Sequence, residues 1–239
     1  MLNDVVAIDA AQQMTVIVPT IGATQAVARV LRQLDDLSVS WIVVQAAASE
    51  SLPTLPKSDA GRVWMRAPAS RGGQIAAAIA RCRTDWIWVV HDDTDVTESA
   101  FRFLCQAVTV GRPLWGRFNV GFRERNLGLR IVAALMNVRS RYTKICTGDQ
   151  AMFFHRSLLD AVGGFPPQRL MEDIEISARL RRQAPQQFVA ATEVVTTSGQ
   201  RWLGHGFWRT VVFMWILRSR YYFGADPDVL FSDYYGDRS

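Results

Sequence analysis

WIWVVHDDTD, residues 86–95, joins a continuous apolar run directly to an acidic cluster. Five consecutive apolar residues are typical of a strand that is buried on both faces of a parallel sheet. In open sheets of this kind, ligands bind at the carboxyl ends of the strands, and the acidic cluster begins where this strand ends. The stretch therefore predicts a buried strand with a ligand site at its end.

Strand and helix patterns alternate before this strand. Apolar β-branched runs predict strands over residues 14–18, 41–44 and 62–65, and helical spacing of apolar residues predicts helices over residues 23–37 and 75–82. Strands that alternate with helices are typical of a mainly parallel central sheet flanked by helices. The expected fold class is therefore α/β.

The second half of the chain has a different pattern. Leu114 to Phe122 alternates strictly between two faces, which predicts a strand with one covered face and one open face, the open one carrying Trp115, Arg117 and Asn119. The remaining expected elements are a helix that starts near Thr97, a helix over about 127–141, a strand over 151–155, a helix over about 171–182, a strand over 194–197 and an apolar helix over 206–223.

No internal repeat and no linker rich in Gly or Ser divides the 239 residues, so we expect a single domain whose halves share one sheet. About residues 14–110 would bind a nucleotide, and about residues 111–203 would bind an acceptor. Residues 204–239 would form a C-terminal apolar helix and a tail.

Composition excludes several classes of protein. Hydrophobic residues make up 49% of the chain, which is enough for a full core and argues against disorder. Lys and Arg exceed Asp and Glu by 27 to 22, and the excess is spread along the chain, which suits phosphate groups better than nucleic acid. A solvated surface with a mild basic bias is the other reading.

The three cysteines are too few and too far apart for a disulfide framework or a zinc site, which favours a reducing compartment. No secretory signal is visible at the start of the chain, and the most apolar stretch is too short to span a bilayer. We therefore expect a cytoplasmic active site, with the inner face of the membrane as one possible place for it.

The acidic cluster has two readings. Asp92, Asp93 and Asp95 repel one another, and folding selects against such crowding unless a cation or strong donors offset it. A hard divalent ion with oxygen ligands would do so. Alternatively, Asp92 or Asp93 caps the helix that starts near Thr97, a role that Thr97 or Asp95 could also fill.

From about Met14 to Leu230, the chain resembles family 2 glycosyltransferases of the GT-A fold. It is most similar to the radical-SAM/selenodomain-associated transferases, whose strand-end motif reads His-Ala-Asp-Thr where other members have Asp-Ala-Asp-Asp. His91-Asp92-Asp93-Thr94 matches that motif. The resemblance implies that Asp93 binds a divalent metal, Mn²⁺ or Mg²⁺, beside the diphosphate. His91 replaces the first acid, and Asp95 is an additional candidate ligand.

Two further motifs of that group lie one in each half of the chain. Arg71 and Gln74 in Ser70-Arg71-Gly72-Gly73-Gln74 resemble its Arg-x-x-Gln, which opens a helix that faces the nucleotide. Phosphate could bind there, because a helix N-terminus offers free amides and arginine a bidentate fork. Asp149 and Gln150 belong to a Thr-Gly-Asp-Gln match and are candidates for acceptor or phosphate contact, although Asp149 could merely anchor a turn.

Two motifs near the end of the chain complete the resemblance. Glu172 and Asp173 match a Glu-Asp pair whose aspartate is the catalytic base of inverting members. Helical spacing places Asp173 near an apolar stripe and points Glu172 further away. The other reading of Asp173 is an acid favoured by the helix dipole. Arg201 and Trp202 match a Ser-Gly-Arg-Arg-Trp motif, in which they would contact phosphate and a sugar face, unless Trp202 is core.

The nucleotide-base region departs from the family pattern. The expected base-binding residues are Pro19 and Thr20 after the first strand, and Gln45 in Gln45-Ala46-Ala47-Ala48-Ser49 after the second. Family members usually carry an acid or amide at the first place and an Asp-Gly-Gly-Ser turn at the second. The missing glycines limit how closely the backbone can approach a base, which leaves the base open.

The resemblance implies metal-dependent, inverting transfer of a sugar from a nucleotide-diphosphate donor to an acceptor hydroxyl. A lipid-linked acceptor is one candidate. The alternatives are a non-catalytic nucleotide-sugar-binding pseudoenzyme and a nucleotidyltransferase, although residues 19–23 supply only one glycine for the phosphate loop that the latter needs. The apolar helix over 207–223 would be buried against the sheet or in a homodimer, or would lie on a membrane surface.

Overall fold

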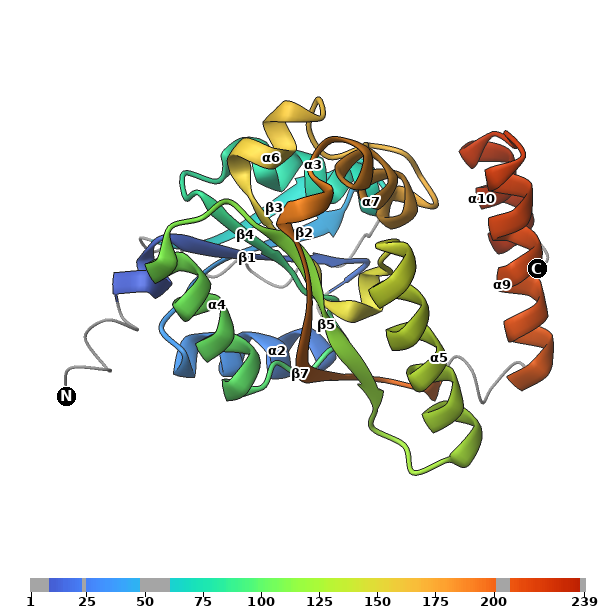
Figure 1. The fold of residues 1–239 in the computed structure, drawn as a ribbon, viewed down its shortest axis with the longest axis horizontal. Coiled ribbons are helices and arrows are strands. Elements are labelled where there is room, and N and C mark those ends of the chain that lie inside the picture. Colours follow the sequence, from blue (N-terminus) through green and yellow to red (C-terminus); the bar gives the residue numbers. More distant parts are fainter. Residues whose placement is uncertain (1–8, 23–24, 48–60, 201–206, 237–239) are drawn as a thin grey trace.

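The computed structural model describes residues 9–22, 25–47, 61–200 and 207–236. Its strands are β1 (Met14–Thr20), β2 (Ser40–Ala46), β3 (Arg62–Ala67), β4 (Trp86–Val89), β5 (Trp115–Phe122), β6 (Phe153–His155) and β7 (Phe188–Thr197). All seven join one sheet in the order β3-β2-β1-β4-β6-β5-β7 (Figure 1). Strands from both halves of the chain therefore lie in the same sheet.

The helices cover both faces of this sheet. They are α2 (Gln25–Asp36), α3 (Arg71–Arg81), α4 (Glu98–Val110), α5 (Leu127–Thr143), α6 (Arg156–Ala161), α7 (Glu172–Gln183), α9 (Phe207–Tyr222) and α10 (Pro227–Gly236), with single turns η1 (Gly148–Gln150) and η2 (Pro185–Gln187). In Figure 1, α2 and α4 lie below the sheet, α3, α6 and α7 lie above it, and α9 stands beside α5. The α/β prediction is confirmed.

Most strand pairs are parallel, as expected. β2 pairs with β1 and β3, β4 pairs with β1, and β5 pairs with β7, all in parallel. The short strand β6 runs antiparallel to both β4 and β5. Its direction was not predicted, because three residues carry no pattern that distinguishes the two orientations.

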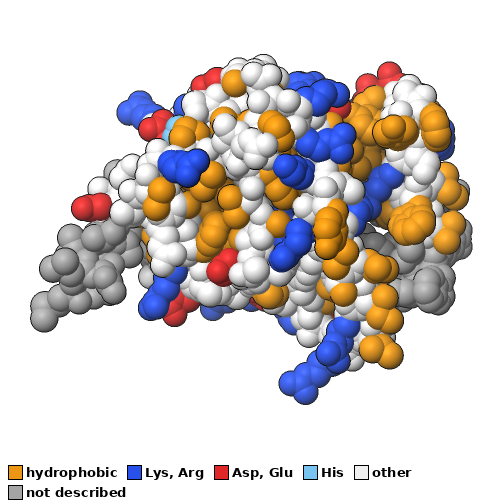
Figure 2. All heavy atoms as spheres, viewed as in Figure 1, with side chains coloured by type: hydrophobic (Ala, Val, Ile, Leu, Met, Phe, Trp, Pro, Cys, Tyr) orange, Lys and Arg blue, Asp and Glu red, His pale blue; other side chains and the backbone are white. Residues whose placement is uncertain are grey.

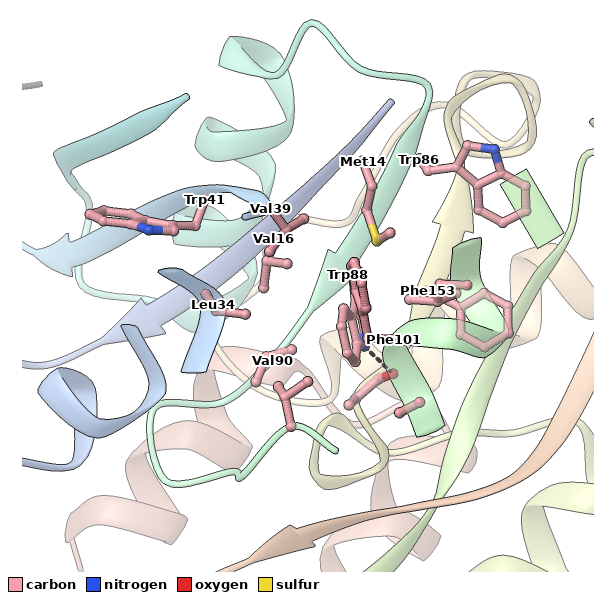
Figure 3. Close-up of a cluster of buried hydrophobic side chains, with 14 of the residues drawn as sticks. Met14, Val16, Leu34, Val39, Trp41, Trp86, Trp88, Val90, Phe101 and Phe153 are labelled. Atoms are coloured by element: carbon pink, nitrogen blue, oxygen red, sulfur yellow. Dashed lines mark hydrogen bonds between the residues drawn. The ribbon is translucent and has the colours of Figure 1, made fainter. Parts of the chain in front are cut away.

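The two sheet faces bury separate apolar clusters. Figure 3 shows one of them, in which Trp88 on β4 and Leu34 on α2 point into the same layer below the sheet. Trp88 is fully buried, and its indole nitrogen donates a hydrogen bond to the Ala151 carbonyl at 3.1 Å. The other cluster packs α3, α6 and α7 against the opposite face. A strand between two such layers needs the continuous apolar sequence that β4 carries.

The expectation that β5 has one open face is wrong. Trp115 and Arg117, assigned to the open face, are both 0% exposed. The Trp115 indole donates to the Ala184 carbonyl at 2.8 Å, and the Arg117 guanidinium donates to the carbonyls of Ala191 and Asn137 at 3.2 and 2.7 Å. A buried arginine that donates to backbone carbonyls has the same place in a hydropathy pattern as an exposed one. The pattern alone therefore could not show that this face is covered.

Several helix boundaries follow from capping side chains. Ser70 Oγ accepts from the Gly73 amide, so α3 begins at Arg71, four residues earlier than predicted. Thr97 Oγ1 accepts from the Ala100 amide and caps α4, so the reading of Asp92 or Asp93 as the cap is wrong. β7 begins at Phe188, six residues earlier than predicted, and α10 was not predicted. No helix in the described part of the chain is long and apolar enough to cross a membrane.

Gly116 provides a test of the packing between β5 and β7. A Cβ atom added there would lie 2.0 Å from the Val189 carbonyl oxygen and 2.8 Å from the Phe153 ring. We expect Gly116→Ala to lower the free energy of unfolding by about 1–3 kcal/mol or more, because the backbone itself must move. Gly236→Ala is the matched control, since it has open space around it, and it should change stability by less than about 0.5 kcal/mol. Equal urea denaturation midpoints for the two variants would contradict this packing.

Candidate active site

The acidic turn after β4 is held by the ends of two strands, β1 and β7, that lie on opposite sides of β4 in the sheet. Thr20, the last residue of β1, places its hydroxyl 2.7 Å from Asp92 Oδ2. Thr197, the last residue of β7, donates to Asp93 Oδ1 at 3.1 Å. The backbone of Asp95 exchanges two hydrogen bonds with Thr196, at 2.6 and 3.2 Å. The turn therefore has a fixed position at the carboxyl ends of the strands.

Asp95 is neutralised by arginines. Its Oδ1 accepts from Arg29 on α2 at 2.7 Å, and its Oδ2 accepts from Arg123, just after β5, at 2.6 Å. Strong donors thus offset part of the crowding of the three carboxylates. Neither arginine was singled out in the sequence, because their convergence on Asp95 depends on contacts between distant segments.

The side chain of His91, at the start of the turn, contacts η1. It is buried, and its Nδ1 lies 3.2 Å from Asp149 Oδ1 on η1. Among the described residues, its buried Nε2 has no hydrogen-bond partner. The ring lies against Gly148, where an added Cβ would come within 2.3 Å of Nε2. Glycine at this position allows η1 to approach the turn.

The predicted metal ligands do not form a preformed three-ligand site. Within the described ranges, no group of three or more His, Cys, Asp or Glu residues could hold a metal ion. His91 contacts Asp149, and Asp95 contacts two arginines, so neither converges on Asp93. Asp93 is half-buried, and no donor among the described residues reaches its Oδ2. One carboxylate with substrate phosphates is a common way to hold Mg²⁺, and Asp93 fits that arrangement.

A small pocket lies beside the turn, between β4, α3 and α7. Its lining consists of Arg71, Ile75, Val89, His91, Gly148, Met152, Phe154, Phe165, Glu172 and Asp173. It therefore brings together charged residues from three of the predicted motifs on an apolar base. Pockets of mixed apolar and convergent polar lining are typical of ligand sites.

Glu172 is the more buried acid of the pair, which corrects the expectation that it points away. It is 5% exposed, and Arg71 Nε lies 3.9 Å from its Oε1, too far for a hydrogen bond. Burial, and after it the charge of Asp173, raise the pKa of Glu172 to about 7 against the opposing charge of Arg71. Helical spacing missed this orientation because α7 begins at Glu172 itself, after Met171 in a left-handed conformation (φ 62°).

Asp173 faces η1 across the pocket. Its Oδ2 accepts from the Gly148 amide at 2.9 Å, and its Oδ1 accepts from the Ile174 amide at 2.8 Å. The carboxylate is half-buried and lines the pocket. It is therefore oriented by backbone donors and remains accessible from the pocket.

Two arginines that the sequence analysis did not single out lie near Asp173. Burial lowers the pKa of Arg139 on α5 to about 10, with a further contribution from the charge of Arg218 on α9. Burial also lowers the pKa of Arg218, which the charges of Asp173 and Asp149 oppose. Helices α5 and α9 thus bring positive charge to the side of the pocket formed by α7 and η1. Only the packing of these helices makes the two residues neighbours.

Two residues that were predicted to contact ligands form hydrogen bonds within the fold. Gln74 is 4% exposed, and its amide nitrogen donates to the carbonyls of Thr20 and Val44 at 2.8 and 2.7 Å, which ties β1 to β2. Gln150 is 0% exposed; its side chain accepts from the Thr147 amide and donates to Ser140 Oγ. Both amide groups are thus bonded within the fold, and the expected roles of Gln74 in nucleotide contact and of Gln150 in acceptor contact stay predictions.

Of the remaining predicted residues, the structure describes some and not others. Pro19 and Gln45 are buried at the ends of β1 and β2. Arg201 and Trp202 lie outside the described residues. Just before them, the Gly199 amide donates to Glu124 Oε2 at 2.6 Å, so this loop is held close to the end of β5.

Comparison with known proteins gives a match in fold. No protein-family model and no curated protein matches the sequence. The 1–349 fragment of S. aureus TarS superposes with a TM-score of 0.55 at 12% identity, over 78% of this chain and 60% of that fragment. Its complex with UDP-GlcNAc gives a TM-score of 0.51 at 13% identity, over 77% of this chain and 56% of that one.

Glucosyl-3-phosphoglycerate synthase from Mycobacterium tuberculosis, in complex with Mn²⁺, UDP and glucosyl-3-phosphoglycerate, gives a TM-score of 0.57 at 13% identity. The match covers 82% of this chain and 75% of that one. The chain therefore has the GT-A glycosyltransferase fold. It spans 60% of the length of the TarS fragment, and the narrower resemblance to the radical-SAM-associated group stays a prediction.

The buried acid pair predicts a pH dependence of stability. The unfolded chain releases the Glu172 proton near pH 4.5 and the folded protein near pH 7, so the folded state holds more protons between these values. The free energy of unfolding therefore falls as the pH rises from 4.5 to 7, by roughly 3 kcal/mol at most, and then levels off.

Glu172→Gln should remove this fall, and exposed Glu98→Gln on α4 should keep it. Denaturation of the three proteins in urea at pH 5, 6, 7 and 8 measures the effect. If Glu172→Gln had the same pH profile as the unmodified protein, Glu172 would not hold its proton in the folded state.

Proposed function

We propose that this protein transfers a sugar from a nucleotide-diphosphate donor to an acceptor hydroxyl, with inversion at the anomeric carbon. The observation that carries the proposal is one pocket at the carboxyl ends of the strands, lined by Arg71, by His91 at the start of the acidic turn and by the Glu172–Asp173 pair. In open α/β sheets, ligands bind at this edge, outside the carboxyl ends of the strands. The structural neighbours TarS and glucosyl-3-phosphoglycerate synthase include complexes with UDP-GlcNAc and UDP.

Asp173 is the proposed catalytic base. It takes the proton from the acceptor hydroxyl, the hydroxyl oxygen attacks the anomeric carbon, and the nucleoside diphosphate leaves from the opposite side. Two backbone amides hold the Asp173 carboxylate, which fixes its direction before the acceptor binds. Because its pKa is raised to about 7, Glu172 holds a proton on the acidic side of neutral pH and can then donate a hydrogen bond in the pocket.

The donor diphosphate would lie between the acidic turn and the start of α3. Asp93 is the proposed ligand for a divalent ion, Mn²⁺ or Mg²⁺, which would supply positive charge next to the diphosphate. Arg71 opens α3 beside the pocket and would bind a phosphate oxygen through its guanidinium. Positive charge fixed at this place stabilises the leaving group, which is often the largest contribution to catalysis.

The division of labour between the halves follows from this arrangement. About residues 14–110 would bind the donor, and about residues 111–203 would supply Asp149, Asp173 and the acceptor side. Arg201 and Trp202 keep their proposed contacts with phosphate and sugar. A non-catalytic nucleotide-sugar-binding protein is the alternative, and it predicts donor binding without transfer.

Substitution of the base separates these two functions. We expect Asp173→Asn to lower kcat by at least about 100-fold, because the amide cannot accept the proton, and to change the donor Kd by less than about threefold. Asp160→Asn on the exposed side of α6 is the matched control and should retain activity. Release of nucleoside diphosphate in the presence of acceptor measures the rate. Near-normal turnover of Asp173→Asn would remove it from the role of base.

The metal ligand is tested by binding alone. Calorimetric titration of UDP, GDP and ADP should show tighter binding with Mn²⁺ than with EDTA for at least one nucleotide. Asp93→Asn should abolish that difference, with a loss of at least about tenfold in Kd, because the amide contributes no negative charge. Asp36→Asn, exposed at the end of α2, should keep it. Equal metal dependence in the Asp93 variant would exclude this carboxylate as the ligand.

A further inference from the structure

Large exposed apolar side chains gather on α5. Leu127, Ile131, Leu135, Val138 and Tyr142 are 50–79% exposed. Their spacing of three and four residues places them along one face of the helix. The opposite face of α5 is buried, with Val132 and Met136 in a small cluster against β5. The exposed stripe is therefore separate from the face of α5 that packs on the sheet.

A second exposed stripe runs along α9. Val212, Trp215, Ile216, Tyr222 and the adjacent Phe223 are 50–85% exposed. Here too the spacing follows the helical repeat. Buried residues of α9, with Leu217 at 0% exposure, pack instead against α10 and the Met171 segment that precedes α7.

The two stripes form one surface, which we call the α5–α9 face. Figure 1 shows the two helices side by side, and the charges of Arg139 on α5 and Arg218 on α9 interact. Figure 2 shows orange side chains gathered over both helices on the same side of the molecule. Single exposed apolar residues are normal, but a contiguous patch of this kind marks an interaction site.

The exposed charge along α5 is positive. Residues 125–147 contain five Arg or Lys and no Asp or Glu. On α9, Arg220 pairs with Asp233 of α10 at 2.6 Å, and Arg218 interacts with the charges of Asp173 and Asp149. Arg125, Arg130 and Arg141 are exposed on α5 or just before it. Apolar stripes that are rich in aromatic residues and flanked by arginines match the boundary between lipid headgroups and acyl chains.

We propose that the α5–α9 face docks this protein on the surface of an anionic lipid bilayer, with both helices lying along the interface. A second copy of the chain fits less well, because a symmetric contact through α5 would bring the exposed Arg125, Arg130 and Arg141 of two copies together. Since α9 packs on the segment that leads into Glu172, docking would set this side of the pocket close to the lipid surface. This inference does not depend on the transfer reaction.

Vesicle sedimentation tests the proposal with the full chain. We expect binding to vesicles of phosphatidylcholine with 30% phosphatidylglycerol, and much weaker binding to pure phosphatidylcholine. Leu135→Ser with Trp215→Ser should lower the partition coefficient by at least about tenfold, and Val110→Ser on α4 should not change it. Arg125→Gln and Arg130→Gln should each lower it about fivefold, and Arg112→Gln should have no effect.

These variants change exposed positions, so thermal unfolding should confirm that they remain folded. Loss of wild-type binding in 0.5 M NaCl provides a check that requires no substitution. Sedimentation that is absent with anionic vesicles would overturn the proposal. So would a stable dimer in analytical ultracentrifugation that Leu135→Ser with Trp215→Ser converts to monomer, because the face would then be an interface between copies.

Discussion

The repulsion among Asp92, Asp93 and Asp95 is the constraint on which the candidate site depends, because three carboxylates in four residues cannot share one turn without donors. Here the donors come from distant parts of the chain: the end of β1, the end of β7, α2 and the segment after β5. The same contacts that relieve the repulsion also fix the turn to both halves of the sheet. Electrostatics and topology are thus coupled at this edge.

The acids of the turn differ in the partners that they bind. Asp95 is occupied by two arginines and acts as a structural link, whereas Asp93 keeps an oxygen that no described donor reaches. His91 contacts η1, and the Gly148 amide of η1 donates a hydrogen bond to Asp173. A continuous set of contacts therefore relates the position of the proposed metal ligand to that of the proposed base.

The sequence predicted the alternation of strands and helices and the residues that meet at the pocket, because apolar runs and motif spacing are local signals. It failed where partners are distant. Arg117 was read as exposed, although it is buried and donates to backbone carbonyls. The hydrogen bonds that the Gln74 and Gln150 side chains form within the fold were not predicted either. Arg139 and Arg218 were missed because only helix packing brings them to Asp173. Polar residues in motifs can serve the fold or the ligand, and spacing alone does not separate the two.

The central claim is that this edge of the sheet is a nucleotide-sugar site that uses a divalent ion. A thermal-shift screen of UDP-, GDP-, ADP- and dTDP-sugars with Mn²⁺, Mg²⁺ or EDTA tests it most directly. The account predicts that at least one donor raises the Tm, and that it does so with a metal ion and not with EDTA. If no nucleotide sugar changed the Tm under any of these conditions at millimolar concentration, the account would be contradicted.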